Sequence, residues 1–286
     1  MNFEQLITGL GLMVPYSLMA LIAIALGHVV IKRVMIMASG DTVPGDNIAA
    51  GIRIAGFCIA MGIGMSGVFV GKNGGFWHDL EMSALYSAGL ILLMIVALKI
   101  NDLAILSGVQ NSLAIANGNV AVAAVEFGGM IATGLIAKGS VSGDGSGWET
   151  FVVFFVLGQG AMVLMVKAYA RVWQRMRNST YSLDREVERG NIAAGIVLGG
   201  KLWAYGLIMS AAVTGKFVSW NHDLVAFAVT AVAGMIFLYV SELLVDKLVV
   251  TGYTAKEIID GRLVQPALVL AAGTIGMAYV ISTVAI

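Results

Sequence analysis

Ionisable side chains inside apolar stretches are the residues of this sequence with the clearest chemical potential. Lys201 lies about ten residues into a hydrophobic segment, which at 1.5 Å per helical residue is roughly 15 Å from its start. Glu242 and Asp246, on the next apolar segment, are its expected partners, and Arg53 and Glu126 of two other segments should pair with each other. Charge buried in lipid is costly, so we treat all five as functional candidates. Purely structural ion pairs are the alternative interpretation.

Asparagine opens three of the apolar segments, at Asn47, Asn119 and Asn191. Asn is favoured at the N-cap of a helix because its side-chain oxygen accepts a hydrogen bond from a free backbone N–H. We therefore predict N-caps at all three positions. An anion or ligand site at the same helix N-termini is the alternative.

The remaining polar motifs do not form a catalytic or metal centre. His78-Asp79 and His222-Asp223 each offer two adjacent ligands, which is too few for a metal site. We interpret them as caps near the membrane surface or as sensors of outside acidity. The sequence has no Ser/His/Asp nucleophile set, phosphate loop or dinucleotide fingerprint. We expect no enzyme activity, no metal and no cofactor.

The composition indicates that lipid surrounds most of the chain. Of its 286 residues, 59% are hydrophobic and 12% are charged, against roughly 25% charged residues in an ordinary soluble domain. Such a chain cannot cover its apolar surface with polar groups. The formal net charge is zero, so no basic surface predicts nucleic-acid binding. The single Cys58 excludes a disulfide within one chain.

The elements that must position the charged residues are membrane-spanning helices. A bilayer core about 30 Å thick needs about 20 helical residues, and helices are favoured over barrel strands because the apolar segments do not alternate in polarity. The sequence therefore predicts an all-α integral membrane protein with eight transmembrane helices. The predicted spans are residues 7–36, 48–70, 80–106, 119–138, 150–172, 191–214, 223–250 and 263–286.

Basic residues predict the orientation of these spans. Lys and Arg are concentrated after the first, third, fifth and seventh spans, and such residues favour the cytoplasmic face. Both termini are therefore predicted to be periplasmic, in a multi-pass protein of a bacterial inner (plasma) membrane. At the cytoplasmic face, Thr254-x-x-Glu257 matches a capping box and predicts a short helix over residues 255–260.

One cytoplasmic loop is strongly charged. We expect it to contact anionic lipid head groups or a cytoplasmic partner, and a plain solvated connector is the alternative. Its basic residues are Arg171, Arg175, Arg177, Arg185 and Arg189.

The chain repeats itself at an offset of 144 residues. Residues 47–52, Asn-Ile-Ala-Ala-Gly-Ile, recur as residues 191–196 (191 − 47 = 144), and Asp102 falls on Asp246. A weaker copy at Asn119 (119 − 47 = 72) gives a two-helix hairpin of 72 residues. We therefore predict two four-helix units, residues 1–144 and 145–286, built from four parallel hairpins.

The repeat separates residues of the fold from residues that are special to one copy. Arg53, Glu126 and Lys201 have apolar counterparts at the offset, so their charges are not part of the repeated fold. Small residues four apart in the second helix of each hairpin do recur, which predicts close helix packing, with a pathway lining as the alternative. These small residues are Gly56, Ala60, Gly64, Gly200, Ala204, Ala272 and Gly276.

The segment Glu188-Arg189-Gly190-Asn191-Ile192-Ala193-Ala194-Gly195, a charged turn that opens an apolar helix, resembles the bacterial inner-membrane family called domain of unknown function 350. The resemblance covers most of the chain and is best at residues 47–108 and 185–250. It implies paired hydrophobic hairpins and an inner-membrane location, and it supplies no biochemical activity. The family's reported gene neighbours, membrane-stress and ATP-grasp ligase genes, imply partners from such systems.

Two functions agree with these patterns. The first is a channel- or transporter-like protein for an ion or small solute, acting as a homo-oligomer in the bilayer, with Lys201, Arg53, Glu126 and Glu242 along a polar pathway. The second is a non-transporting scaffold that recruits a cytoplasmic partner through residues 171–189 and 254–262. The charges that the repeat does not share favour the first function.

Overall fold

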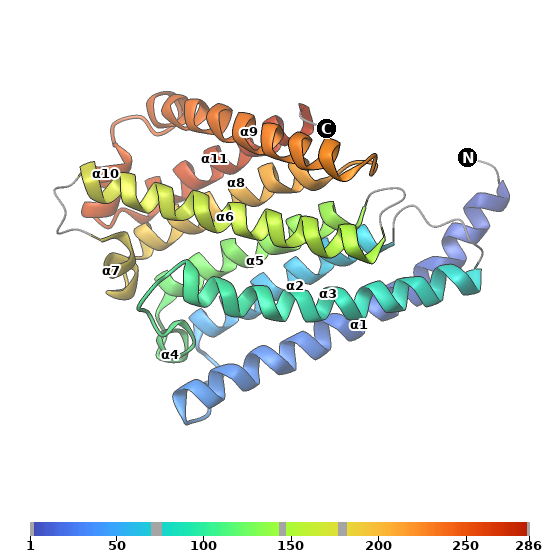
Figure 1. Cartoon of the computed structure of the whole chain (residues 1–286). Helices are drawn as coiled ribbons and strands as arrows, with labels where there is room; N and C mark the ends of the chain where they lie inside the picture. The colour runs from blue at the N-terminus through green and yellow to red at the C-terminus, as the bar shows by residue number, and fades with distance from the viewer. Residues whose placement is uncertain (1–2, 70–75, 143–146, 177–181, 285–286) are drawn as a thin grey trace.

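The computed structural model describes residues 3–69, 76–142, 147–176 and 182–284. Within these residues the chain forms eight long helices, each long and apolar enough to cross a membrane (Figure 1). The prediction of an all-α protein with eight spans is confirmed. The long helices are α1 (Phe3–Ser39), α2 (Ile48–Val68), α3 (Phe76–Ala104), α5 (Val120–Val141), α6 (Trp148–Met176), α8 (Ile192–Val213), α9 (Trp220–Leu248) and α11 (Val264–Val284).

The long helices form two rows. Helices α2, α5, α8 and α11 pack side by side in that order, with α3 over α2 and α5, α6 over α5 and α8, and α9 over α8 and α11. Helix α1 contacts α2 and α3 at one edge (Figure 1). Each two-helix hairpin therefore adds one helix to each row. Helices α5 and α8, in the middle of the inner row, are the most enclosed of the spans.

Glycines let the central helices touch backbone to backbone. A Cβ atom at Gly128 of α5 would lie 1.9 Å from the carbonyl oxygen of Gly199 on α8. A Cβ at Gly195 of α8 would lie 2.4 Å from the carbonyl oxygen of Ala121. Residues without bulk at such points permit the close packing that holds helices together in lipid. This contact joins the first half of the chain to the second.

The predicted small-residue contacts are confirmed in α2 and α8 and wrong in α11. A Cβ at Gly56 would meet Phe127, one at Gly64 would meet Leu90, and one at Gly200 would meet Ala271. Gly276 has no atom within 4 Å of such a Cβ, and Ala272 is exposed. The reason is that α11 ends the inner row and packs on α8 on one side only.

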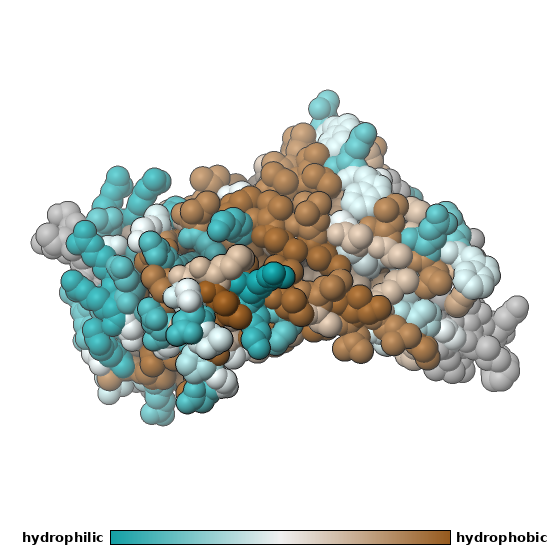
Figure 2. Space-filling model, turned by 90° about the horizontal axis from the view of Figure 1, so that it is seen from below, coloured by the Kyte–Doolittle hydropathy of each residue, from teal (hydrophilic) through white to brown (hydrophobic). Residues whose placement is uncertain are grey.

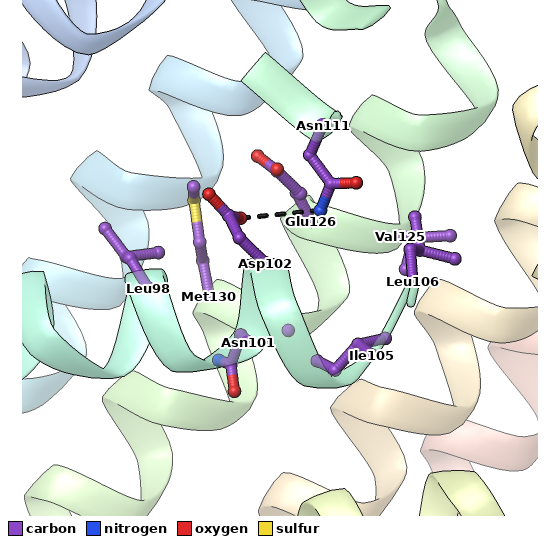
Figure 3. Close-up of a pocket in the computed structure, with 10 residues that line it drawn as sticks. Leu98, Asn101, Asp102, Ile105, Leu106, Asn111, Val125, Glu126 and Met130 are labelled. Atoms are coloured by element: carbon purple, nitrogen blue, oxygen red, sulfur yellow. Dashed lines mark hydrogen bonds between the residues drawn. The ribbon is translucent and has the colours of Figure 1, made fainter. Parts of the chain in front are cut away.

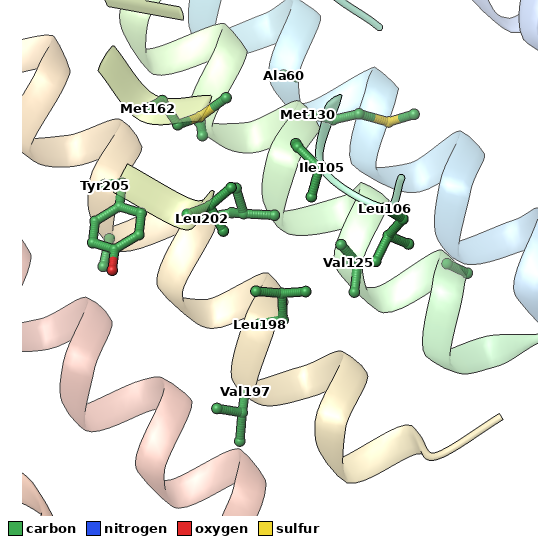
Figure 4. Close-up of a cluster of buried hydrophobic side chains, with 14 of the residues drawn as sticks. Ala60, Ile105, Leu106, Val125, Met130, Met162, Val197, Leu198, Leu202 and Tyr205 are labelled. Atoms are coloured by element: carbon green, nitrogen blue, oxygen red, sulfur yellow. The ribbon is translucent and has the colours of Figure 1, made fainter. Parts of the chain in front are cut away.

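An apolar core fills the space between the rows (Figure 4). Leu106, Met130 and Leu202 are among its fully buried side chains. Large apolar side chains also cover much of the outer surface, where Leu103 and Leu164 are each 72% exposed. In the face shown in Figure 2 the hydrophobic surface forms a broad middle belt, with hydrophilic residues gathered at one end. An apolar belt of this kind is what a multi-pass membrane protein presents to lipid.

Three short helices lie at the end of the bundle where the inner helices begin (Figure 1). They are α4 (Asn111–Ala116), α7 (Leu183–Glu188) and α10 (Ala255–Asp260), which start 72 residues apart. The predicted α10 and its capping box are confirmed. Helices α4 and α7 were not predicted, because six residues are too few to show a hydropathy period. The start of α1 and the end of α11 lie at the opposite end.

Several spans are longer than predicted. Helix α1 begins at Phe3 rather than residue 7, α3 begins at Phe76 rather than residue 80, and α6 continues to Met176 rather than residue 172. The extra turns carry charged or aromatic residues at the ends of the spans, which lower the local hydropathy without stopping the helix. The other helix ends lie within three residues of the prediction.

Candidate functional site

Arg53 of α2 lies between two carboxylates near the end that carries the short helices. Its Nε is 2.7 Å from Oε2 of Glu126 on α5, and its Nη2 is 3.6 Å from Oδ2 of Asp102 on α3. Its Nη1 donates a hydrogen bond to the hydroxyl of Ser112 at 2.9 Å. The predicted Arg53–Glu126 pair is confirmed. Asp102 joins it because α3 lies over the groove between α2 and α5.

Helix α4 closes this cluster from the end of the bundle (Figure 3). The side-chain amide of Asn111 donates to Oδ1 of Asp102 at 3.4 Å. The cavity beside it, lined in part by Asn101, Asp102, Asn111 and Glu126, has a volume of about 10 Å³. A water molecule needs roughly 10–15 Å³. The cluster is therefore closed to anything much larger than one water.

A polar stripe runs from this cluster along α5. Asn119, Glu126, Thr133 and Ser140 follow one another every seven residues, which places them on one face of the helix. Glu126, Thr133 and Ser140 are all buried, at 8%, 0% and 5% exposure. The stripe thus extends along almost the whole length of one of the most enclosed helices.

Neighbouring helices add polar groups at the middle of the stripe. The hydroxyl of Thr133 donates to the carbonyl of Gly129 at 2.9 Å and accepts from the side-chain amide of Asn101, on α3, at 3.1 Å. It also lies 3.4 Å from Oε1 of Gln159, on α6. Asn101 and Gln159 are both buried. Three helices therefore meet in a polar contact inside the bundle.

The stripe is a property of α5 and not of the repeated fold. Most residues at the equivalent positions of the other inner helices are apolar. These are Ile54, Met61 and Val68 on α2, Leu198, Tyr205 and Ala212 on α8, and Leu270, Met277 and Val284 on α11. Packing alone therefore does not require a carboxylate and two hydroxyls here. The sequence analysis missed Thr133 and Ser140, although their seven-residue spacing from Glu126 was a usable signal.

A second charged cluster lies in the other half of the chain. Nζ of Lys201, on α8, is 2.6 Å from Oε2 of Glu242 on α9. The same ammonium group lies 4.3 Å from the ring centroid of Tyr169, on α6, a cation–π contact. Of the two predicted partners, Glu242 makes the ion pair, and Asp246 is one turn further along α9.

The second cluster is displaced by one helical turn relative to the first. Lys201 lies four residues beyond Val197, the counterpart of Arg53, and Glu242 lies four residues before Asp246, the counterpart of Asp102. Since α8 and α9 run in opposite directions, both changes move the pair the same way, by about 6 Å away from the short helices. The two halves thus hold similar clusters at different depths.

The three asparagines cap the inner helices, as predicted, and also tie neighbouring hairpins together. Each side-chain oxygen accepts from the backbone three residues on, at Ala50, Val122 and Ala194. Each side-chain amide donates to a carbonyl at the end of the next short helix: Asn47 to Ala116 at 2.9 Å, Asn119 to Glu188 at 2.9 Å and Asn191 to Ile259 at 2.8 Å. Both polar groups of each asparagine side chain are therefore engaged within the fold.

A polar cavity of about 260 Å³ opens at the opposite end of the bundle. Its lining includes Ser140 at the far end of the stripe, Thr150 of α6 and the pair His222–Asp223 of α9. His222 Nδ1 lies 2.8 Å from Oδ1 of Asp223. Among the described residues no group of three or more His, Cys, Asp or Glu is arranged to hold a metal.

The predicted basic loop lies on the surface of the short-helix end. Arg171 and Arg175, on α6, and Arg185 and Arg189, at α7, are exposed, and Arg177 lies outside the described residues. None of the four takes part in the ion pairs of Arg53 or Lys201. Arg189 Nη1 is 3.5 Å from Oε1 of Glu186. They form a charged surface, separate from the buried clusters.

A cavity of about 650 Å³ opens beside this surface, lined in part by Ser107, Asp184, Arg185 and Glu188. Burial raises the pKa of Asp184, and the nearby Lys167 opposes that shift. Nζ of Lys167 donates to the hydroxyl of Ser107 at 2.7 Å. The cavity thus offers both signs of charge.

Comparison with known proteins agrees with the repeat. The family model described as Domain of Unknown Function (DUF350) matches the chain twice, at residues 5–141 and 144–285. No curated protein and no solved structure matches it. The two matches cover nearly the whole chain in tandem and confirm the duplication. The protein is therefore a multi-pass member of the DUF350 family that carries two copies of the family unit.

Proposed function

We propose that the protein moves a small cation across the bacterial inner membrane along the polar stripe of α5. The observation that carries this proposal is the buried series Glu126, Thr133 and Ser140, where the other three inner helices have mostly apolar residues. An ionisable residue inside a membrane is expensive and marks an ion or proton path by default, and Thr133 and Ser140 continue the polar face from Glu126. The stripe extends from the Arg53 cluster to the 260 Å³ cavity at the opposite end.

The sizes of the spaces support a small cation over a larger solute. The cavity beside Glu126, at about 10 Å³, holds at most about one water. A dissolved metabolite would need the two rows of helices to separate. A species handed between hydroxyl, amide and carboxyl groups needs no such opening.

The proposed orientation places the short helices in the cytoplasm and both termini in the periplasm. Basic residues gather at the short-helix end, as the inside-positive rule requires of a cytoplasmic face. Among the described residues, those at or near this end are Lys32, Arg33, Lys99, Lys167, Arg171, Arg175, Arg185, Arg189, Lys247, Lys256 and Arg262, against Lys138 and Lys216 at the other. In this orientation Ser140 faces the periplasmic cavity and Glu126 the cytoplasmic side.

Flux through purified protein in liposomes tests the proposal. Protons, sodium and potassium are scanned for the wild type and for Glu126→Gln, which keeps the shape of the side chain and removes its charge. Glu81→Gln is the matched control, because Glu81 lies exposed on α3. We expect flux in the wild type and the control, and its loss in Glu126→Gln. Unchanged flux in Glu126→Gln would remove α5 from the path.

Lys201→Met shows whether the second cluster belongs to the same path. Lys201 contacts α9 and α6 and is not on the stripe of α5. Flux that persists in this variant assigns the path to α5 alone. Flux that disappears, with the protein still folded, places Lys201 on it as well.

A second candidate function is a scaffold that recruits a cytoplasmic partner. The observation that favours it is the charged surface of α7 beside the 650 Å³ cavity. Arg185, Glu188 and Arg189 are exposed there. Glu186 is buried, and its Oε2 accepts a hydrogen bond from the side-chain amide of Asn191 at 3.1 Å. Replacing the three exposed residues by Ala, with Glu186 kept, should abolish co-purification of a partner under this function. Co-purification that survives the change would count against it.

A further inference from the structure

The Arg53 cluster holds one fixed positive charge and two carboxyl groups. Glu126 contacts the guanidinium at 2.7 Å and Asp102 at 3.6 Å, from two different helices. Side-chain exposure is 3% for Arg53, 6% for Glu126 and 20% for Asp102. With both carboxyl groups ionised, the cluster would carry one uncompensated negative charge in a largely buried position, which is strongly unfavourable.

Among the described residues, Arg53 is the only cation that forms an ion pair with Glu126 or Asp102, and Lys99, one turn before Asp102 on α3, is exposed. Helix α4 contributes the neutral Asn111 and Ser112. Lys167 of α6 donates hydrogen bonds to the carbonyl of Ile105 at 3.1 Å and to the hydroxyl of Ser107 at 2.7 Å. The cluster therefore becomes neutral when one cation of unit charge binds to its carboxyl groups.

The available space limits what that species can be. A sodium ion needs several oxygen ligands around it in addition to its own volume, and the adjacent cavity measures about 10 Å³. A proton needs no volume. Two carboxyl groups held at one site share a proton readily, because like charges at close range cannot both persist.

A buried oxygen atom of the cluster that lacks a hydrogen-bond donor also indicates a proton. Oε1 of Glu126 is buried with no hydrogen-bond partner among the described residues. An unmet buried acceptor costs about 1–3 kcal/mol. A proton on one carboxyl group supplies the O–H donor that the cluster lacks.

We propose that Glu126 and Asp102 hold one proton between them, so that the Arg53 cluster is neutral, and that this proton is the transported cation. Uptake adds H⁺ to one carboxylate oxygen, and release returns the carboxylate to Arg53; no bond other than O–H forms or breaks. The transport half of this inference rests on the function proposed above. The shared proton does not, since it follows from the charges of the cluster.

Infrared spectroscopy of the protein in lipid nanodiscs at neutral pH tests the shared proton. Exposed carboxyl groups are ionised at that pH, so a carboxylic-acid C=O band reports buried protonated groups. We expect a band in the wild type that shifts when H₂O is replaced by D₂O. The band should be lost in Glu126→Gln and in Asp102→Asn, and kept in Glu81→Gln. If one of the two variants does not fold, the other still removes a partner of the proton.

Two results would overturn the proposal. The first is a wild-type carboxylic-acid region identical to that of both variants. The second is thermal stabilisation of the wild type by sodium over potassium that disappears in both variants, which would make sodium the occupant. The infrared result and the flux result are independent. A band without flux supports the shared proton and refutes the transport path. Sodium flux without the band supports the transport path and refutes the shared proton.

Discussion

The contact between Gly128 and Gly199 offers the sharpest test of how the two family units are joined. In Gly128→Ala the added Cβ would lie 1.9 Å from the carbonyl oxygen of Gly199, and 2.5 and 2.6 Å from its C and Cα atoms. Ordinary contact begins near 3.4 Å, so α5 and α8 would have to separate by about 1.5 Å at this point. All three neighbours are backbone atoms, so no side chain can move aside.

The cost follows from that geometry. Overpacking a well-packed interior costs about 1–3 kcal/mol and occasionally more, and backbone neighbours place this site at the upper end. Alanine recovers up to about 1 kcal/mol of helix propensity relative to glycine. We expect a net loss of about 2–3 kcal/mol. At roughly 2–4 °C per kcal/mol for chains of this size, the melting temperature should fall by about 5–10 °C.

Thermal unfolding in detergent, followed by tryptophan fluorescence, measures the effect. Gly51→Ala is the matched control, because Gly51 is also in an inner helix and has nothing within 4 Å of a Cβ. Its melting temperature should stay the same or rise slightly. If Gly128→Ala has the same melting temperature as Gly51→Ala, the close contact between the two units does not exist as described.

Two further substitutions test the fixed parts of the fold by the same assay. Asn191→Leu removes the cap of α8 and the hydrogen bonds to Ile259 and Glu186, and it should lower the stability by about 2–3 kcal/mol. Leu263→Asn, at the equivalent place before α11, is the control and should change the stability little. Equal melting temperatures for the two variants would argue against the tie between hairpins. Arg53→Met leaves buried carboxyl groups without their cation and should cost about 3–5 kcal/mol. The double variant Arg53→Met, Glu126→Met should recover part of that loss of stability. A larger loss in the double variant would show that the unpaired Glu126 is not the cause of the destabilisation.

Hydropathy was sufficient to predict the eight spans because each must be apolar over its whole length. It could not order the helices in space. The two-row arrangement depends on which faces carry small residues, and the sequence shows such residues on several faces at once. Gly276 illustrates the limit: its spacing resembles that of Gly200, but α11 has no neighbour on that side. Contact surfaces at the end of the row therefore could not be read from the spacing.

The short helices α4 and α7 could have been predicted from information in the sequence. The capping box at Thr254 correctly predicted α10 over Ala255–Asp260. Subtracting the 72-residue period once and twice from residue 255 gives residues 183 and 111, where α7 and α4 begin. Their own sequences lack the Thr and Glu of the box, so local capping signals gave no indication of them. The period carried the information that local sequence did not.

The two buried charged clusters were predicted only in part. Arg53–Glu126 and Lys201–Glu242 were found because an isolated charge in an apolar segment requires a partner. Asp102 was visible as a repeated residue but could not be assigned to Arg53, since that contact depends on α3 lying over α2 and α5. Asn101 and Gln159 are neutral and follow no repeated spacing along their helices, so nothing in the sequence marked them as partners of Thr133.

The repeat also separates the residues of the shared fold from the residues that are special to one helix. Asn47, Asn119 and Asn191 recur, and each ties its hairpin to the next one along the row. The fourth position, before α11, is Leu263. Residues that recur in this way maintain the fold. Glu126, Thr133 and Ser140 break the repeat on an inner helix whose other faces are filled by neighbours. Three inner helices form the same fold with mostly apolar residues at these positions, so the shared fold does not account for the polar groups of α5, and we attribute them to the proposed cation path.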